Sequence, residues 1–128
     1  MLPKMASTHE KVSPPPAGED GTHTRASAAA GLDGILKLLE GRWKLTILFQ
    51  LFGGQVLRFS DLERAIPGIS QKMLIQQLRQ MERDGIVRRE VYPQVPPRVE
   101  YALTDWGQAL CPALDALLKW AAQRPAGE

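Results

Sequence analysis

A chain of 128 residues with 44% apolar residues and a formal net charge of +2 has the size and composition of one small globular domain. No apolar run approaches the roughly 18 residues of a membrane span, and Met1 to Lys11 carries no apolar segment typical of a secretion signal. A single cysteine, Cys111, excludes an intramolecular disulfide, so we expect a cytoplasmic protein with no membrane partner.

Residues 1–28 differ in composition from the rest of the chain. They are rich in Pro, Ser, Thr, Ala and Gly and have almost no large apolar side chain to bury. Ordering such a segment costs conformational entropy without a return from burial, so we predict a flexible arm. Both histidines, His9 and His23, lie in this arm, where no rigid set of metal ligands can form, so we expect no metal and no cofactor. The expected parts are thus an arm (1–28), a folded domain (29–124) and a disordered C-terminus (125–128).

Apolar residues recur at helical spacing in the two segments that follow the arm. The first series predicts a helix that ends near Gly41, and the second predicts a helix that ends at Gly53-Gly54. After them we expect a short extended link from Gln55 to Phe59. The two series are Leu32, Ile35, Leu36 and Leu39, and then Trp43, Ile47, Leu48, Leu51 and Phe52.

Two capped helices joined by a tight turn are predicted next. Ser60-Asp61-Leu62-Glu63 has the Ser-x-x-Glu form of a capping box, in which the Ser and Glu side chains satisfy free amides at a helix start. Pro67-Gly68 ends that short helix, and Ser70 begins a second helix that runs to about Arg83. The pair Asp84-Gly85 then indicates a helix end. Helix, turn and helix in this order form the first half of a winged helix-turn-helix.

The helix from Ser70 to Arg83 has one apolar side and one cationic side. Residues placed 100° apart around its axis give a narrow apolar stripe. Glu82 lies closer to this stripe than to the opposite face. That opposite face, flanked by Met73 and Gln80, carries side chains that pair with base edges and phosphates. An ordinary solvated helix face is the alternative. The stripe is Leu74, Leu78 and Met81, and the polar face is Lys72, Gln76, Arg79 and Arg83.

Two strand-like runs, Ile86 to Tyr92 and Arg98 to Leu103, flank a tip with three prolines. The prolines stiffen the tip and discourage edge-to-edge pairing, which favours a β-wing over a plain connecting turn. Arg98 at its rim can place a cation near the DNA backbone or in the minor groove. In the second run Val99, Tyr101 and Leu103 point one way, and Arg98, Glu100 and Ala102 point the other.

A long amphipathic helix is predicted after Thr104. Pro112 cannot donate to the helix ladder, so we expect a kink or a break near Gln108. The apolar stripes of the first and last helices carry more apolar surface than the core of one domain can bury. This surplus predicts a two-fold homodimer through these helices, with Trp106 and Trp120 as packing or dimer anchors. The expected interface residues are Leu32, Ile35, Leu36, Leu114, Leu117, Leu118 and Ala121.

Together these elements predict a mainly α (α+β) fold, a winged helix-turn-helix with a two-stranded β-wing and terminal dimerisation helices. From Arg58 to Arg98 the chain carries eight cations and five anions, so positive charge gathers where the helix-turn-helix and the wing are expected. In a dimer the two cationic helices would meet half-sites about 34 Å apart on a near-palindromic operator.

Several separate motifs follow one another along the chain: Gly41-Arg-Trp-Lys, Phe59-Ser-Asp-Leu, Ile66-Pro-Gly-Ile-Ser-Gln-Lys-Met-Leu, Leu78-Arg-Gln-Met-Glu-Arg-Asp-Gly-Ile-Val, Tyr92-Pro-Gln-Val-Pro-Pro-Arg-Val-Glu-Tyr and Leu103-Thr-Asp-Trp-Gly. These motifs resemble those of the HxlR-type transcriptional regulators, compact bacterial winged-helix proteins related to the MarR group. The resemblance covers about residues 29 to 122.

The resemblance implies a homodimeric, sequence-specific regulator that binds double-stranded DNA. Its recognition helix matches Ser70 to Arg83, and Arg98 matches its wing arginine. Gln77 departs from the family pattern, in which arginine is frequent at this position. The residues expected to contact DNA are Ser70, Gln71, Lys72, Met73, Gln76, Gln77, Arg79, Arg83 and Arg98.

Many relatives of this kind carry a reactive cysteine just before the first helix. The matching segment here, Ala26 to Leu32, has none. Cys111 lies instead in the predicted last helix, where a lone cysteine on an apolar helix is typical of buried packing, with a redox role as the alternative.

Three functions remain open at the level of the sequence, and none is enzymatic. The predicted domain has no histidine, no Gly-rich phosphate loop and no hydrolase motif, so we expect no enzyme. The first function is a dimeric DNA-binding regulator, and the second is a winged-helix protein-interaction module without specific DNA binding. The third is a redox-responsive or ligand-responsive form of the regulator, in which a small apolar effector enters between the dimer helices.

Overall fold

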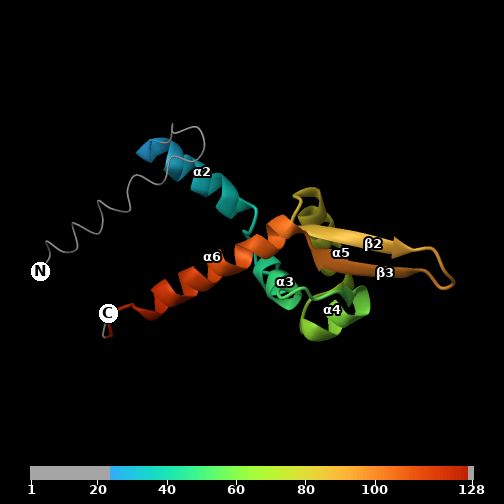
Figure 1. Ribbon diagram of the computed structural model, residues 1–128. Helices are drawn as coiled ribbons and strands as arrows, with labels where there is room; N and C mark the ends of the chain where they lie inside the picture. The colour runs from blue at the N-terminus through green and yellow to red at the C-terminus, as the bar shows by residue number, and fades with distance from the viewer. Residues whose placement is uncertain (1–23, 127–128) are drawn as a thin grey trace, which may run out of the picture. The chain divides into compact units, whose positions relative to one another are not determined.

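The computed structural model describes residues 24–126, whose helices and strands are labelled in Figure 1. The chain divides into two compact units, Met1–Glu40 and Gly41–Glu128. Residues 1–23 of the predicted arm, with both histidines, and residues 127–128 lie outside the described part. The elements in chain order are α2 (Arg25–Lys37), α3 (Lys44–Leu51), β1 (Leu57–Arg58), α4 (Phe59–Ala65), α5 (Gln71–Arg83), β2 (Val87–Tyr92), β3 (Arg98–Leu103) and α6 (Asp105–Ala122).

Helix α2 is the described helix of the first unit. It begins at Arg25 because the Thr24 hydroxyl accepts a hydrogen bond from the Ser27 amide (3.0 Å) and the Ser27 hydroxyl accepts one from the Thr24 amide (2.8 Å). Residues 25–28, which the composition assigned to the flexible arm, are therefore helical, since a capped alanine-rich segment favours the helix. No residue of α2 is buried.

The second unit has one aliphatic core between its helices and its sheet. Helices α3, α4 and α6 lie against β3, and α5 lies against β2. Most of this core consists of the apolar residues that helical spacing predicted. Because α4 and α5 both contribute buried side chains, the core holds these two helices in place. Its fully buried side chains are Ile47, Leu48, Leu51, Leu62, Ile66, Leu74, Leu78, Met81 and Val87.

Helix α5 has the boundaries that its capping residues predict. The Ser70 hydroxyl accepts a hydrogen bond from the Met73 amide (3.0 Å), which satisfies a free donor at the helix start. The helix ends at Arg83, and Gly85 then takes a φ of 79°, a left-handed conformation that costs glycine little. The predicted apolar stripe is confirmed, because Leu74, Leu78 and Met81 are at most 1% exposed.

The sheet is antiparallel in the order β1-β3-β2. Strands β2 and β3 form the predicted hairpin, which extends beyond the helices of its unit in Figure 1. The link expected from Gln55 to Phe59 is only partly a link, since Leu57 pairs with Tyr101 and Arg58 pairs with Glu100. The predicted two-stranded wing is confirmed as β2 and β3, and β1 adds a third strand to the sheet. Strand β1 was not predicted because two residues are too few to show a period of two.

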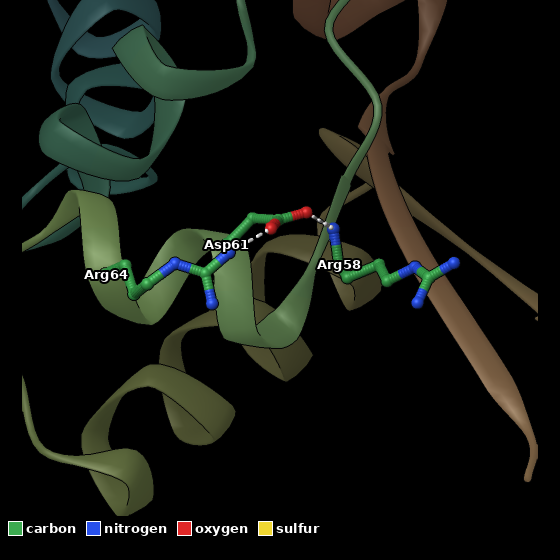
Figure 2. Close-up of polar contacts among 3 residues, drawn as sticks. All are labelled: Arg58, Asp61 and Arg64. Atoms are coloured by element: carbon green, nitrogen blue, oxygen red, sulfur yellow. Dashed lines mark hydrogen bonds and ion pairs between the residues drawn. The ribbon is translucent and has the colours of Figure 1, made fainter.

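Helix α4 begins one residue before the predicted capping serine. The Asp61 carboxylate accepts the Arg58 amide on Oδ2 (3.0 Å) and the Arg64 guanidinium on Oδ1 (2.7 Å), as Figure 2 shows. The predicted capping box of Ser60 and Glu63 is therefore wrong. Strand β1 makes Arg58 the last extended residue, so Asp61 is the third helical residue and the one that reaches back to the free amide.

Helix α6 is attached to the base of the hairpin. The Thr104 hydroxyl donates to the Gly85 carbonyl (2.6 Å) and accepts from the Gly107 amide (3.0 Å), so it both caps α6 and ties it to the end of α5. A Cβ atom added at Gly107 would lie 2.4 Å from the Ile86 carbonyl oxygen, so glycine is needed for this approach.

Helix α6 runs from Asp105 to Ala122 without interruption and contains Pro112. Of the kink or break predicted near Gln108, the break is therefore wrong, and the kink stays a prediction. Proline removes one amide donor, whose partner would be the Gln108 carbonyl, and the remaining hydrogen bonds of this long helix hold the segment together.

Candidate nucleic-acid interface

The side of α5 opposite its buried stripe is open to solvent, as the helical spacing predicts. Its four polar side chains are exposed, and they line a shallow concave surface together with Gln71 and Ile75. No ion pair within residues 24–126 involves its three cations. Their full donor capacity is available to an anionic partner. We call these residues the α5 face: Lys72, Gln76, Arg79 and Arg83.

The other α5 residues predicted to contact DNA lie outside this face. Ser70 uses its hydroxyl oxygen to cap the helix, and Gln71 is exposed beside the cap. Met73 and Gln77 are half-buried, and Gln77 Nε2 donates to Met73 Sδ (3.4 Å). The exposed polar ridge is thus narrower than the predicted set, with Met73 and Gln77 on its flank.

A groove of about 570 Å³ lies between α5 and the sheet. Arg79 borders it from α5 and Arg89 borders it from β2, so the cationic surface continues from the helix to the hairpin. Glu82 is exposed and also lines this groove, so one carboxylate borders the α5 face on the side of the sheet. The lining residues are Phe59, Gln71, Ile75, Arg79, Glu82, Arg89, Val99 and Tyr101.

On the hairpin, Arg98 is held by its neighbours. Its Nε donates to Glu100 Oε2 (2.7 Å), its Nη2 lies 2.5 Å from the same oxygen, and its Cζ lies 5.2 Å from the centre of the Tyr92 ring. From the sequence, Arg98 is expected as a cation at the rim of the wing, and Glu100 has no expected role. The alternation predicted for this strand puts both side chains on one side of β3, which was the available signal.

An apolar surface covers part of α3 and the second half of α6. Five exposed side chains form it around a hollow of about 330 Å³ whose exposed lining is apolar. Leu114 is 8% exposed, so most of its side chain packs in the core, but it also lines this hollow, as does Ala121. The predicted dimer role of both residues stays a prediction. On α2, Leu32, Ile35 and Leu36 are exposed as predicted. We call the following residues the α3–α6 surface: Leu45, Phe49, Leu117, Leu118 and Trp120.

Leu45 and Phe49 were not among the residues predicted to form an interface. Their spacing of four residues puts them on one side of α3, apart from the buried Ile47 and Leu48. This spacing could have predicted from the sequence that the two side chains share a surface. Trp106 and Trp120 are 53% and 70% exposed, so neither ring is buried in the core of this protomer.

Comparison with known proteins places this geometry in a family. The family model described as HxlR-like helix-turn-helix matches residues 38–126. This chain belongs to the HxlR-like family. The match includes the helix-turn-helix, the hairpin and α6, and it confirms the resemblance that the motifs indicated.

Relatives of this HxlR-like protein are named as regulators. An HTH-type transcriptional regulator from Methanothermobacter thermautotrophicus is 52% identical over 80 residues, which is 62% of this chain and 60% of the relative. A MarR-family transcriptional regulator from Enterococcus faecalis V583 has a solved structure with a TM-score of 0.72 and 40% identity, covering 79% of this chain and 88% of that one. The winged helix-turn-helix predicted from the sequence is therefore confirmed.

A second similar structure is the redox regulator HypR in its reduced form, with 41% identity, a TM-score of 0.66 and coverage of 72% of this chain and 90% of that one. In the present HxlR-like protein, Cys111 is half-buried on α6. No group of three metal-ligating side chains and no helix suited to crossing a membrane occurs between residues 24 and 126.

Proposed function

We propose that this protein is a sequence-specific DNA-binding transcriptional regulator that acts as a homodimer. The observation that carries the proposal is the α5 face, where Lys72, Arg79 and Arg83 are exposed and form no ion pair within the described residues. An exposed cationic helix beside a β-hairpin fits the major groove of DNA with the wing beside it.

In the proposed complex each side chain of the α5 face has a role that follows from its chemistry. Gln76 can pair bidentately with adenine, and Arg79 can pair bidentately with guanine. Lys72 and Arg83 supply positive charge to phosphate oxygens and fix the register of the helix. Arg98 contacts the backbone or the minor groove from the hairpin.

The α3–α6 surface supports the homodimer, together with the exposed leucine and isoleucine side chains of α2. Contiguous exposed apolar side chains mark an interaction surface, and a two-fold interface presents the same patch from each protomer. The proposed dimer would place its two recognition helices on half-sites about 34 Å apart on a near-palindromic operator.

A gel-shift titration of the protein against its own upstream intergenic DNA tests the proposal, repeated over a salt series. We expect Arg79→Ala to weaken operator binding by about 5- to 150-fold, the range for one bidentate base contact. Arg124→Ala is the matched control, because Arg124 is an exposed arginine beyond the end of α6. Salt-insensitive binding, or an Arg79→Ala variant that binds as tightly as the control, contradicts the proposal.

A ligand-responsive form of the regulator is the second candidate. The observation in its favour is the wholly apolar hollow of the α3–α6 surface, whose volume suits a small apolar effector. Binding there would change DNA affinity only if the effector binds the DNA-competent arrangement with a different affinity. A protein-interaction module that does not bind DNA is the outcome if the gel shift finds no specific complex and the α5 face carries no function.

A further inference from the structure

We propose that Glu100 is the positioning residue for the wing arginine, so that Arg98 meets DNA with its guanidinium already oriented. This inference rests on the proposed function, because the orientation matters only if the wing touches DNA. The residues that carry it are Arg98, Glu100 and Tyr92, all on one side of the β2–β3 hairpin.

Two neighbours fix the Arg98 guanidinium at once. Its Nε and Nη2 both reach Glu100 Oε2, at 2.7 Å and 2.5 Å, and Tyr92 lies directly opposite Arg98 in the strand register with its ring 5.2 Å from Cζ. Two donors on one edge and a ring near the guanidinium restrict the rotation of the side chain. The Nη1 donors have no partner within the described residues and remain free for a phosphate.

The hairpin contains a second arginine–glutamate pair that serves as an internal comparison. Arg88 Nη1 lies 2.9 Å from Glu90 Oε1, and both side chains are about half exposed, at 50% and 49%. The side chain of Glu100 is only 11% exposed, whereas that of Arg98 is 41% exposed. A carboxylate withdrawn from water holds its partner more strongly than one that solvent screens on both sides.

Glu100 occupies a position that is costly unless it is paired with a cation. In the strand register it lies directly opposite Glu90 on β2 and directly opposite Arg58 on β1. Two carboxylates face to face across a sheet destabilise it, and burial of a charge adds to that cost. Arg98 offsets this cost through its two donors, which explains why its guanidinium lies against Glu100 rather than extending freely into solvent.

The positioning role of Glu100 predicts that removing this carboxylate weakens DNA binding, whereas net charge alone predicts the opposite. Removing a carboxylate next to a DNA-binding surface should strengthen binding if only net charge matters, because DNA repels it. If Glu100 orients Arg98, the same change should weaken specific binding, because the arginine then loses its orientation before it reaches the phosphate.

The test compares Glu100→Gln with Glu90→Gln by gel shift on the operator and on unrelated DNA of equal length. Each substitution removes one negative charge from the same side of the hairpin. We expect Glu100→Gln to weaken operator binding about fivefold to tenfold, as for one oriented charge-assisted contact, and Glu90→Gln to leave it equal or slightly tighter. Tighter operator binding by both variants overturns the inference.

Two further variants keep the test decisive if Glu100→Gln unfolds, which circular dichroism would detect. Arg98→Lys keeps the charge but loses the Nε and Nη2 pair, so positioning predicts a clear loss of operator affinity and a charge-only contact predicts none. Tyr92→Leu leaves the buried carboxylate in place and removes the ring, with an expected loss of about twofold to threefold. Unchanged binding by both variants also overturns the inference.

The double variant Arg98→Ala with Glu100→Gln separates this inference from the proposed function. If Glu100 acts through Arg98, the double variant should bind operator no more weakly than Arg98→Ala alone, since the residue that Glu100 positions is already gone. Failure of the unmodified protein to bind any operator overturns the proposed function. Normal operator binding by that protein and a loss in Arg98→Ala, without a loss in Glu100→Gln, overturns only the positioning role.

Discussion

The α5 face and the outer side of the hairpin both carry cations, but they hold them differently. On α5 the cations Lys72, Arg79 and Arg83 form no ion pair within the described residues, whereas Arg88 and Arg98 on the hairpin each pair with a glutamate two residues along the same strand. A cation without an ion pair can adapt to its binding partner, but it loses side-chain conformational entropy when it binds. A cation in an ion pair is ordered beforehand, but its partner carboxylate weakens its attraction for a second anion. In the proposed complex, one domain would therefore present DNA with an adaptable cationic surface and a pre-ordered one.

The largest expected effect breaks the scaffold that holds both surfaces. Gly107→Ala should lower the free energy of unfolding by roughly 2–3 kcal/mol, because its Cβ would lie 2.4 Å from a backbone oxygen that cannot turn aside. Chemical denaturation measures the loss. Gly34→Ala is the matched control, since a Cβ at Gly34 on α2 meets nothing within 4 Å. Equal stability of the two variants would contradict this account of the α6 attachment.

The next effect sharpens the contrast between free and paired cations through salt dependence. Substituting Lys72 or Arg83 by alanine should each lower the slope of log affinity against log salt by about 0.9, because each removes one phosphate contact. Arg88→Ala should change the slope much less, because Glu90 already neutralises part of that charge. Gel shifts over a salt series measure these slopes. Equal changes for all three variants would show that pairing on the hairpin does not matter for DNA.

A smaller effect concerns the start of α4, which leads into the turn before α5. Asp61→Ala should cost roughly 1 kcal/mol of stability, since it leaves the Arg58 amide without its acceptor. Ser60→Ala should change stability by less than about 0.5 kcal/mol, because Ser60 is exposed and does not cap the helix. Thermal unfolding of both variants measures the difference. A larger loss at Ser60 than at Asp61 would restore the capping box predicted from the sequence.

The smallest expected effect is the contribution of the exposed hairpin pair to stability. Arg88→Ala should change the free energy of unfolding by about 0–1 kcal/mol, since both partners are half exposed and solvent screens their attraction. Denaturant titration measures it. A loss well above this range would mean that the Arg88–Glu90 pair is as firmly held as the Arg98–Glu100 pair, which would remove the basis for comparing them.

The sequence alone predicted the parts of the fold that repeat with a clear period. The apolar stripe of α5, its caps at Ser70 and Gly85, and the alternation of β3 all depend on spacing, and the structure confirms them. Strand β1 was missed because two residues cannot display a period, and the α4 cap was misplaced because its start depends on pairing with a distant strand. Local patterns do not reveal such long-range partners.

The candidate site was predictable in its outline but not in its ion pairing. Helical spacing alone identified Lys72, Gln76, Arg79 and Arg83 as a shared exposed side. It could not show that Glu100 binds Arg98, because the choice of partner depends on the burial of Glu100 and on Tyr92 across the strands. Helical spacing also did not reveal that Leu114 is largely buried in its own protomer while it lines the apolar hollow, because a helical stripe alone does not show which of its residues pack inward.

The Thr104 junction has a mechanical consequence. The Thr104 hydroxyl joins Gly85, just beyond the end of α5, to the first turn of α6, and the Thr104 amide also donates to the Ile86 carbonyl next to the start of β2 (3.0 Å). Gly107 also packs closely against the Ile86 carbonyl, so α5, the hairpin and α6 meet without a flexible loop between them. If a molecule bound along α6 tilted this helix, the start of the β2–β3 hairpin would therefore move with it, because no flexible loop lies between them.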